Sequence, residues 1–301
     1  MQLTILETRP APELRRLPAW LKRPLPNADF PHTRRVVEAS GVATVCEEAK
    51  CPNLSECWSH RHATFMILGD RCTRRCDFCA VTTARPDPPS PDEPRRLAWA
   101  VQELALRHVV VTAVARDDLA DEGAGHFAKC VTEIRRASPQ CIVEALPADF
   151  HARRELVGTL CDAGPDIYNH NQETVERLSP VIRPQAKYRR SLEVLALVKR
   201  LRPTMWTKSG LMVGLGETRE EFSQAMRDLR SVGVDILTVG QYLRPSVNHA
   251  PVVRYLPPRE FDEIAAEASD MGFSSVAAGP FVRSSYNAAE VYQAIGRARS
   301  A

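Results

Sequence analysis

The chain has 301 residues, of which 44% are hydrophobic and 26% are charged, and its net charge is +3. This length allows one large domain or two small ones, and the composition is typical of a soluble globular protein. The weak positive charge lacks the basic footprint of a nucleic-acid-binding domain, so we expect no nucleic-acid partner. No run approaches the ~18 apolar residues of a membrane span, and the first residues lack the basic and apolar regions of a secretory signal. We therefore expect a cytoplasmic protein without a membrane partner.

The first 31 residues carry six prolines, which interrupt any helical periodicity. We expect them to form an irregular extension that wraps around the body of the protein. A short helix is predicted over Thr33–Ser40, because Gly41 provides a stop signal. The first cysteines follow that helix, and we expect them in a loop that contains Pro52 and Asn53.

From residue 64 onward, short apolar runs rich in β-branched residues alternate with helical patterns. The predicted strands are Thr64–Leu68, His108–Val114, Cys141–Leu146, Asp166–Tyr168, Gly210–Gly214 and Asp235–Val239. The helical patterns between them lie near residues 92–107, 122–137, 151–163, 187–201 and 218–232. Strict alternation predicts a parallel sheet, and about six units are too few for an eight-fold barrel. The predicted fold class is therefore α/β, an open, partial (β/α)6 barrel of the TIM type. A helix near 258–271, a strand near 274–278 and a helix near 286–298 complete the chain.

Polar residues follow the predicted strands, at the edge where ligands bind in parallel α/β folds. These residues are Gly69–Cys72, Thr112, Asp117–Asp118, Asn169–Glu173, Gly214–Glu217 and Gln241–Tyr242. Their shared position predicts an active-site rim.

Six of the nine cysteines lie close together in two groups of three, and the two groups have different spacings. The spacings are Cys46-x4-Cys51-x5-Cys57 and Cys72-x3-Cys76-x2-Cys79. In a reducing cytosol, clustered cysteines indicate metal ligands or catalysts rather than disulfides. Three thiolates per group indicate metal clusters that something other than cysteine completes. The three remaining cysteines fall in helical or strand patterns and are predicted to pack in the core. They are Cys130, Cys141 and Cys161.

The second cysteine group lies in the loop after the first regular strand, among Arg71, Arg74 and Arg75. Such a loop can wrap three thiolates around one cubane, and we expect the positive charge to favour thiolates over thiols. One iron would then be free to chelate the amine and carboxylate of a small molecule. The alternatives are a three-cysteine zinc site, although zinc sites prefer four ligands, and cysteines packed in a core.

The spacing of the second group, with Phe78 before its last cysteine, resembles the signature of radical S-adenosylmethionine enzymes. The resemblance implies a 4Fe–4S cluster held by Cys72, Cys76 and Cys79, whose open iron binds S-adenosylmethionine. In that superfamily the cluster reduces this cosubstrate to a 5′-deoxyadenosyl radical, which abstracts hydrogen. The partial barrel also matches the fold of that superfamily.

Further motifs narrow the resemblance to the lipoyl synthase family. They are Cys46-Glu-Glu-Ala-Lys-Cys51-Pro-Asn-Leu-Ser-Glu-Cys57-Trp58, Ala63–Asp70, Arg116-Asp117-Asp118, Tyr168-Asn-His-Asn171, Gly214–Glu217, Gly240-Gln-Tyr242 and Arg283-Ser284-Ser285-Tyr286. The resemblance implies an auxiliary 4Fe–4S cluster with Cys46, Cys51, Cys57 and Ser285 as its ligands. A hard alkoxide ligand would let one iron leave when the cluster gives up sulfide. The alternative role of Ser284–Ser285 is to cap the last helix, and Ser284 is the better suited of the two to that role.

The resemblance also implies a reaction. The substrate is an octanoyl group that is attached by an amide to a lysine of a carrier protein domain. Two deoxyadenosyl radicals remove hydrogen from C6 and C8, and each carbon then takes a sulfur atom from the auxiliary cluster. Because these C–H bonds are unactivated, a cofactor radical is needed where acid–base side chains would fail.

The same resemblance implies three kinds of protein partner. The first is an octanoylated lipoyl carrier domain, either the glycine cleavage H protein or a 2-oxoacid dehydrogenase E2 domain. The second is an electron donor such as ferredoxin or flavodoxin. The third is an iron–sulfur carrier that repairs the spent cluster.

The cosubstrate residues follow from a similar segment of biotin synthase, and imply Asn171 and Glu173 as ligands of the ribose hydroxyls. The alternative is a solvated polar loop after a strand. Two positions depart from the lipoyl synthase pattern. Ala115 stands where Asp is common before Arg-Asp-Asp, which leaves a rim contact in doubt, and Asn-Ala-Ala-Glu290 follows Tyr286 where a glycine is frequent.

We therefore divide the chain into an N-terminal extension with the auxiliary-cluster motif (1–60), the partial barrel (61–282) and a C-terminal segment with the cluster serine and last helix (283–301). Two other functions stay open. A radical enzyme that uses its second cluster for electron transfer would keep four durable ligands. An iron–sulfur carrier or sensor would need far fewer residues and no open iron.

Overall fold

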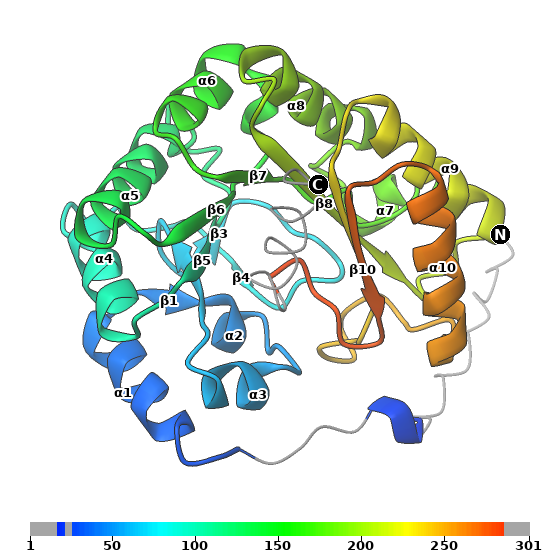
Figure 1. Ribbon diagram of the computed structural model, residues 1–301, viewed down its shortest axis with the longest axis horizontal. Helices are drawn as coiled ribbons and strands as arrows, with labels where there is room; N and C mark the ends of the chain where they lie inside the picture. Colours follow the sequence, from blue (N-terminus) through cyan, green and yellow to red (C-terminus); the bar gives the residue numbers. More distant parts are fainter. Residues whose placement is uncertain (1–16, 22–25, 286–301) are drawn as a thin grey trace, which may run out of the picture.

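Seven parallel strands and one antiparallel edge strand form the main sheet of the computed structural model, which describes residues 17–21 and 26–285 (Figure 1). The strand order is β1-β2-β5-β6-β7-β8-β9-β10, and only β1 runs antiparallel to its neighbour. The bounds are β1 (Ala43–Thr44), β2 (Thr64–Ile67), β5 (His108–Ala113), β6 (Ile142–Leu146), β7 (Ile167–Asn169), β8 (Trp206–Val213), β9 (Ile236–Gln241) and β10 (Ser275–Gly279). The predicted α/β fold with a mostly parallel sheet is confirmed.

Helices cover the outer side of this sheet, as Figure 1 shows. They are α4 (Glu93–Glu103), α5 (Ala124–Ala137), α6 (Arg154–Asp162), α8 (Tyr188–Leu201), α9 (Arg219–Ser231) and α10 (Pro258–Asp270). Each turns an apolar face to the strands, as α5 does with Phe127, Val131 and Ile134. One apolar cluster lies under α4 to α6, and a second lies under α9 and α10. The three remaining cysteines are buried in the first cluster, which confirms their predicted packing role.

Strand β8 begins at Trp206, four residues before its predicted start at Gly210. The missed residues Thr207, Lys208 and Ser209 are polar but fully buried, which a hydrophobic pattern does not reveal. Lys208 forms an ion pair with buried Glu144 of β6 at 3.0 Å. A buried charge is tolerated when it is paired in this way, so the hydrophobic pattern misplaced the start of this strand.

Helix α1 (Phe30–Ser40) begins three residues before its predicted start at Thr33. Pro31 lies in its first turn, where a missing N–H costs nothing and the fixed φ suits a helix. The prediction that residues 1–31 are irregular is therefore wrong for Phe30 and Pro31, which are helical. The helix stops at Gly41, which has the left-handed φ of 57° that its C-cap requires.

Several short elements complete the described chain. They are η1 (Ala19–Leu21), α2 (Val45–Glu48), α3 (Leu54–Ser59), β3 (Arg71–Cys72), β4 (Thr82–Thr83), η2 (Phe150–Ala152) and α7 (Ser179–Ile182). Strands β3 and β4 form a separate parallel pair. The helix expected near 286–298 lies outside the described residues. Within the described chain, no helix combines the length and apolar character that crossing a bilayer requires.

Candidate functional site

The second cysteine group follows β2 through a sharp turn in which Leu68 and Gly69 have φ values of 69° and 94°. The Sγ atom of Cys72 accepts hydrogen bonds from the backbone N–H groups of Arg74 and Ala115, at 3.4 Å and 3.3 Å. These two contacts fix the position of the Cys72 sulfur at this end of the loop.

Ala115, which departs from the family pattern, supports this loop with its main chain. Besides its N–H contact with Cys72, its carbonyl accepts hydrogen bonds from the N–H and Oγ1 of Thr73, at 3.1 Å and 3.0 Å. Main-chain contacts do not depend on the side chain at that position. The alanine therefore leaves these loop contacts in place.

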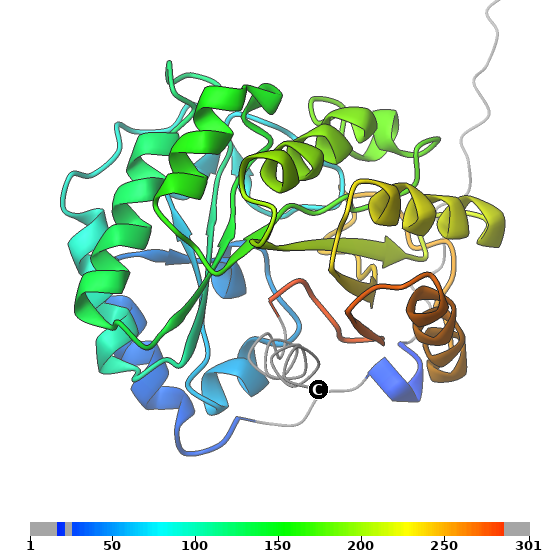
Figure 2. The ribbon, with the colours of Figure 1, turned by 45° about the horizontal axis from the view of Figure 1, so that its top comes forward.

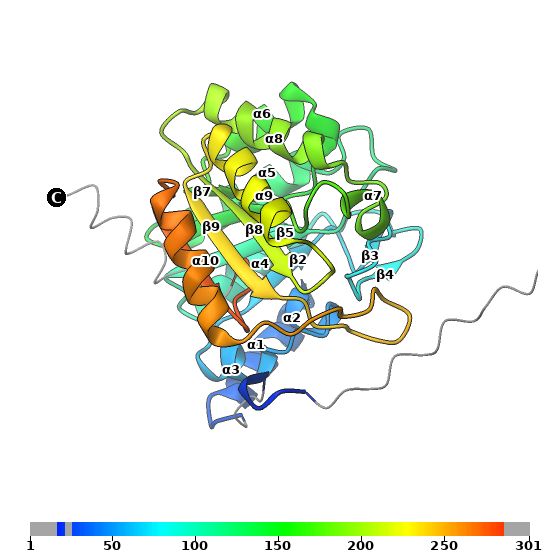
Figure 3. The same ribbon diagram turned by 90° about the vertical axis from the view of Figure 1, so that its right-hand side faces the viewer.

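Two further segments hold the other end of the cysteine loop. The N–H of Asp77 donates to the Ile182 carbonyl at 2.9 Å, and the N–H of Ala250 donates to the Asp77 carbonyl at 2.8 Å. Nε2 of His249 lies 3.0 Å from the Cys79 carbonyl, and its Nδ1 lies 2.8 Å from the Ser246 hydroxyl. Since a carbonyl only accepts, the Nε2 atom carries the proton. Figure 3 shows β3, β4, α7 and the loop after β9 on the same side of the molecule.

Arg74 joins the cysteine loop to the carboxyl ends of β5 and β6. Its buried guanidinium makes a bidentate contact with Asp117, at 2.8 Å and 2.7 Å, and a further contact with Asp149 at 2.9 Å. Although burial raises the pKa of both carboxyls, the hydrogen bonds and charge of Arg74 outweigh it and lower both pKa values. Asp149 also pairs with Arg190 at 3.2 Å.

The sequence pattern does not single out Asp149, although it lies just beyond a predicted strand, as the other rim residues do. Its position in Leu-Pro-Ala-Asp149 after β6 is the signal that could have found it. The structure brings it to the loop through Arg74, a contact between segments that local spacing cannot reveal.

Burial, rather than the nearby arginines, has the largest effect on the pKa values of Cys76 and Cys79, contrary to the prediction that these arginines favour thiolates. Arg74 is neutralised by its two carboxylates, and Arg71 lies 3.5 Å from Asp87. Burial raises the pKa of Cys76 to about 12 and that of Cys79 to about 11. Repulsion from the charge of neighbouring cysteines in the group adds to both pKa values, so these side chains lie within electrostatic range of one another. A cation bound by all three would relieve this repulsion, so the donor set fits a metal cluster better than a thiol core.

Glu173 lies within electrostatic range of the second cysteine group, since its charge contributes to the raised pKa values of Cys76 and Cys79. Asn171 makes a side-chain hydrogen bond with Glu173. Glu173 has a left-handed φ of 65°, and its backbone bonds to β8 on both sides. Burial raises the pKa of its carboxyl, while Arg183 and a hydrogen bond from Asn171 oppose this shift. A half-buried carboxylate on a strained backbone, beside a candidate metal centre, is typical of a ligand-binding position.

Asn171 offers an atom that fits a ligand. Its Oδ1 is buried and has no hydrogen-bond partner among the described residues, while its Nδ2 lies 3.3 Å from the Ser284 hydroxyl. A side-chain Cβ at Gly210 would lie 2.8 Å from this Oδ1, so glycine is needed there. Buried polar atoms are normally paired, and an unpaired one at a site edge fits a hydroxyl donor.

The first cysteine group does not lie in one loop, as predicted, but on two short helices and their connection. Thr44 caps α2, which carries Cys46, by accepting the N–H of Glu47, and α3 carries Cys57. Burial raises the pKa of Cys46 to about 11, and the charge of Cys51 adds to it, so the two side chains lie within electrostatic range of each other. The N–H of Cys57 donates to the Asn53 carbonyl at 2.8 Å.

The end of the described chain returns to this region. We call residues Gly279–Ser285 the serine segment; Figures 1 and 2 show this red stretch running from β10 toward α2 and α3. The side-chain amide of Asn53 donates to the Phe281 carbonyl at 2.7 Å. Ser285 is half-buried at the end of the segment, and Tyr286 lies outside the described residues.

The turn over Gly214–Glu217 closes on itself. The carboxylate of Glu217 accepts the N–H groups of Gly214 and Leu215, at 2.6 Å and 2.9 Å. A Cβ at Gly214 would lie 2.2 Å from Nε2 of Gln241 and 2.4 Å from the Arg254 carbonyl. The space that a side chain at position 214 would need is therefore occupied by Gln241 and by the main chain of Arg254.

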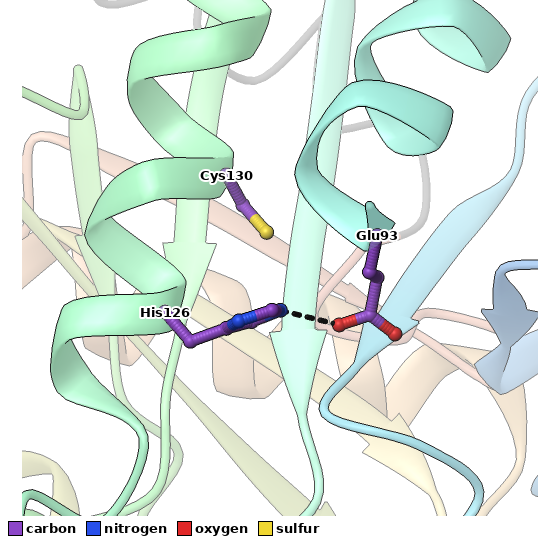
Figure 4. Close-up of side chains that lie close together, drawn as sticks. All are labelled: Glu93, His126 and Cys130. Carbon is purple, nitrogen blue, oxygen red and sulfur yellow. Dashed lines mark hydrogen bonds and ion pairs between the residues drawn. The ribbon is translucent and has the colours of Figure 1, made fainter. Parts of the chain in front are cut away.

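Besides the two cysteine groups, a group of three side chains with possible metal-ligand atoms lies between α4 and α5 (Figure 4). Glu93, His126 and Cys130 each offer a ligand atom within 4.8 Å of the others. One carboxylate oxygen of Glu93 accepts both His126 Nε2, at 2.7 Å, and the N–H of Leu68, at 2.9 Å. Burial raises the pKa of the Cys130 thiol above its ordinary range. We therefore interpret this cluster as support for the strained Leu68 turn that precedes the cysteine loop.

Comparison with protein families places the fold and the cysteine loop in one class. The Radical SAM superfamily model matches residues 66–229, which include the second cysteine group and Asn171 and Glu173. The crystal structure of methylornithine synthase matches with a TM-score of 0.51 at 12% identity, covering 89% of this chain and 88% of that protein. The chain is a member of the radical SAM superfamily.

Curated relatives give the family within that class. The lipoyl synthase of Rubrobacter xylanophilus is 55% identical over 276 residues, which are 91% of this chain and 85% of that protein. The lipoyl synthase of Pasteurella multocida is 54% identical over 282 residues, covering 93% and 88%. The chain therefore belongs to the lipoyl synthase family.

Proposed function

We propose that this chain inserts two sulfur atoms, at C6 and C8, into an octanoyl group attached to a lysine of a carrier protein domain, which forms the lipoyl cofactor. The observation that carries the proposal is a pair of three-cysteine groups on a chain 55% identical to a lipoyl synthase. When bound, two 4Fe–4S clusters and S-adenosylmethionine supply the radical hydrogen abstraction and the sulfur atoms.

In this proposal the second cysteine group holds the cluster that binds the cosubstrate. Cys72, Cys76 and Cys79 supply three thiolates and leave one coordination position for S-adenosylmethionine. The neighbouring Asn171 and Glu173 bind its ribose hydroxyls. Support comes from the unpaired buried Oδ1 of Asn171 and from the closeness of Glu173 to the cysteines. The chain's part is to hold these groups in place before any ligand arrives.

The first cysteine group holds the auxiliary cluster that donates sulfur. Cys46, Cys51 and Cys57 supply thiolates, and Ser285 supplies an oxygen ligand. Support comes from the contact between Asn53 and Phe281, which ties the serine segment to this group. An oxygen ligand binds iron–sulfur centres less well than thiolate does, which suits a cluster that is dismantled during the reaction.

The finer architecture belongs to the same proposal. Residues 61–282 form an open, partial (β/α)6 barrel, and residues 1–60 and 283–301 are extensions that supply the auxiliary-cluster ligands. The protein substrates are octanoylated lipoyl carrier domains of the glycine cleavage H protein or of 2-oxoacid dehydrogenases. Ferredoxin or flavodoxin supplies electrons, and an iron–sulfur carrier rebuilds the spent cluster. The reducing cytoplasm is the compartment that suits nine free cysteines.

The test is the mass of an octanoyl-lysine peptide after anaerobic incubation with the reconstituted protein, S-adenosylmethionine and dithionite. We expect the peptide to gain two sulfur atoms. Formation of 5′-deoxyadenosine without sulfur in the peptide would contradict the substrate but keep the radical chemistry. Failure to cleave S-adenosylmethionine would contradict the enzyme class itself.

A further inference from the structure

Asn53 lies between Cys51 and Cys57 and is almost completely buried, with 1% of its surface exposed. It occupies the N-cap position of α3, where an asparagine side chain usually accepts a backbone N–H, but its side chain makes no such contact. Instead its Nδ2 donates to the Phe281 carbonyl at 2.7 Å. The buried side-chain amide of Asn53 thus contacts the serine segment instead of capping its own helix. This contact links the first cysteine group to the end of the described chain.

The main chain of Asn53 also takes part in a hydrogen bond. Its carbonyl accepts the N–H of Cys57 at 2.8 Å, so the same residue contacts a cysteine of the first group and the serine segment. Phe281 precedes Ser285 by four residues, which span at most ~14 Å when fully extended. Fixing the Phe281 carbonyl therefore confines Ser285 to the surroundings of the first cysteine group.

On the side away from Asn53, the serine segment packs closely against β9. After β10 the chain turns at Gly279, whose carbonyl accepts the N–H of Val282 at 3.1 Å. The Val282 carbonyl then passes so near to Gly240 of β9 that a Cβ there would lie 1.9 Å from it. The segment thus runs between β9 and Asn53, and a change on either side would displace it.

We infer that Asn53 is a positioning residue that holds the serine segment against the first cysteine group, so that Ser285 reaches the auxiliary cluster. The inference rests on the proposed function, in which Ser285 is a ligand. Asn53 touches no iron in this assignment; it acts through the Phe281 main chain. It restricts where the serine hydroxyl can go and so favours its binding over water at the same iron.

The experiment measures how fast a chelator removes iron from the anaerobically reconstituted full-length protein. A chain with Cys46, Cys51 and Cys57 replaced by alanine identifies the iron that belongs to the second group. We expect Asn53→Ala to speed iron release from the first group about fivefold, as the loss of one buried hydrogen bond allows. Asn53→Asp, which has the same shape but no amide donor, should do at least the same.

A double variant separates positioning from general support. If Asn53 acts through Ser285, Asn53→Ala adds nothing once Ser285→Ala is present, because both remove the same ligand. Additive effects would overturn the inference. Asn27→Ala is the matched control, since it removes a side-chain amide contact with the Ser59 carbonyl at the other end of α3. It should leave iron release unchanged.

The outcomes also separate this inference from the proposed function. Faster release in Ser285→Ala but not in Asn53→Ala overturns only the role of Asn53. No change in Ser285→Ala overturns the serine ligand and the inference with it. If Asn53→Ala loses iron from both groups, Gly240→Ala decides, because it displaces the Val282 carbonyl from the opposite side. Gly240→Ala must then release iron selectively from the first group, and unselective release would overturn the inference.

Discussion

The two cysteine groups differ in how the chain holds them. The second group lies in one loop, and hydrogen bonds with Ala115, Ile182 and His249 fix this loop from several sides. The first group lies on two short helices, and its proposed fourth ligand comes from the serine segment at the far end of the chain. A loop that is fixed from several sides suits a metal centre that survives each turnover. A site assembled from separate pieces suits a cluster that is consumed and rebuilt.

The largest effects are expected from removing one cysteine of each group. Cys76→Ala should abolish cleavage of S-adenosylmethionine, because the second cluster loses a ligand. Cys51→Ala should abolish sulfur transfer but keep 5′-deoxyadenosine formation within about threefold, since the second group is intact. Chromatography of deoxyadenosine and the peptide mass measure the two activities.

Cys161→Ala is the control for these variants, since this cysteine is buried in the core outside both groups. It should retain both activities. Cleavage that survives in Cys76→Ala, or cleavage lost in Cys51→Ala, would contradict the division of roles.

Removal of the charge that anchors the second loop should have the next largest effect. Arg74→Gln leaves the fully buried Asp149 with Arg190 as its only ion-pair partner in the described chain. We expect unfolding free energy to fall by ~3 kcal/mol, as for a broken buried ion pair. Arg71→Gln in the same loop removes an exposed pair with Asp87 and should cost at most ~0.5 kcal/mol. Urea unfolding of the metal-free chain measures both, and equal losses would contradict the anchoring role.

The ion pairs of Arg74 with Asp117 and Asp149 also predict a pH dependence of stability. The pKa values of Asp117 and Asp149 are lowered from 3.8 in the folded chain. Their ionised forms therefore stabilise the fold fully above the unfolded pKa, and this stabilisation is lost as pH falls through the folded values. The difference between the natural chain and Arg74→Gln should be largest at neutral pH and shrink below about pH 4. A difference that grows on acidification would contradict this sign.

A change of the proposed fourth ligand, Ser285, sharpens the contrast between a durable and a consumed cluster. Ser285→Cys should keep both clusters but slow sulfur transfer about tenfold, because thiolate binds the departing iron more firmly than an alkoxide does. Ser274→Ala, at an exposed serine just before β10, is the control and should keep the rate of transfer. Single-turnover formation of the thiolated peptide measures both rates, and unchanged transfer in Ser285→Cys would count against Ser285 as a ligand.

The smallest effect is expected at the turn before the second group. Glu93→Gln weakens the charge-assisted hydrogen bonds to His126 and to the N–H of Leu68. We expect it to lower the unfolding free energy by ~1.5 kcal/mol and to leave both clusters bound. Glu103→Gln, at the exposed end of the same helix, should change stability by less than ~0.5 kcal/mol. Equal effects in urea unfolding would contradict the support role of Glu93.

The sequence pattern predicts the alternating elements and the two cysteine groups, because periodicity and spacing are local properties. It misplaces β8, since Lys208 is buried by pairing with Glu144, a partner on another strand. It also overlooks Asp149, and it gives Asn53 no partner. The contact between Asn53 and Phe281 joins residues far apart in the chain, and one sequence does not reveal such a pair. Side chains with local partners were thus predictable, while those that connect segments were not.

The most direct test of the division between the two groups is the origin of the inserted sulfur. The chain would be reconstituted with heavy-isotope sulfide, freed of excess sulfide, and allowed one turnover with an octanoyl-lysine peptide in the presence of light sulfide. We predict a product in which both sulfur atoms are heavy, with iron lost from the first group only. A product with light sulfur, or iron lost from the second group, would contradict this account of the two sites.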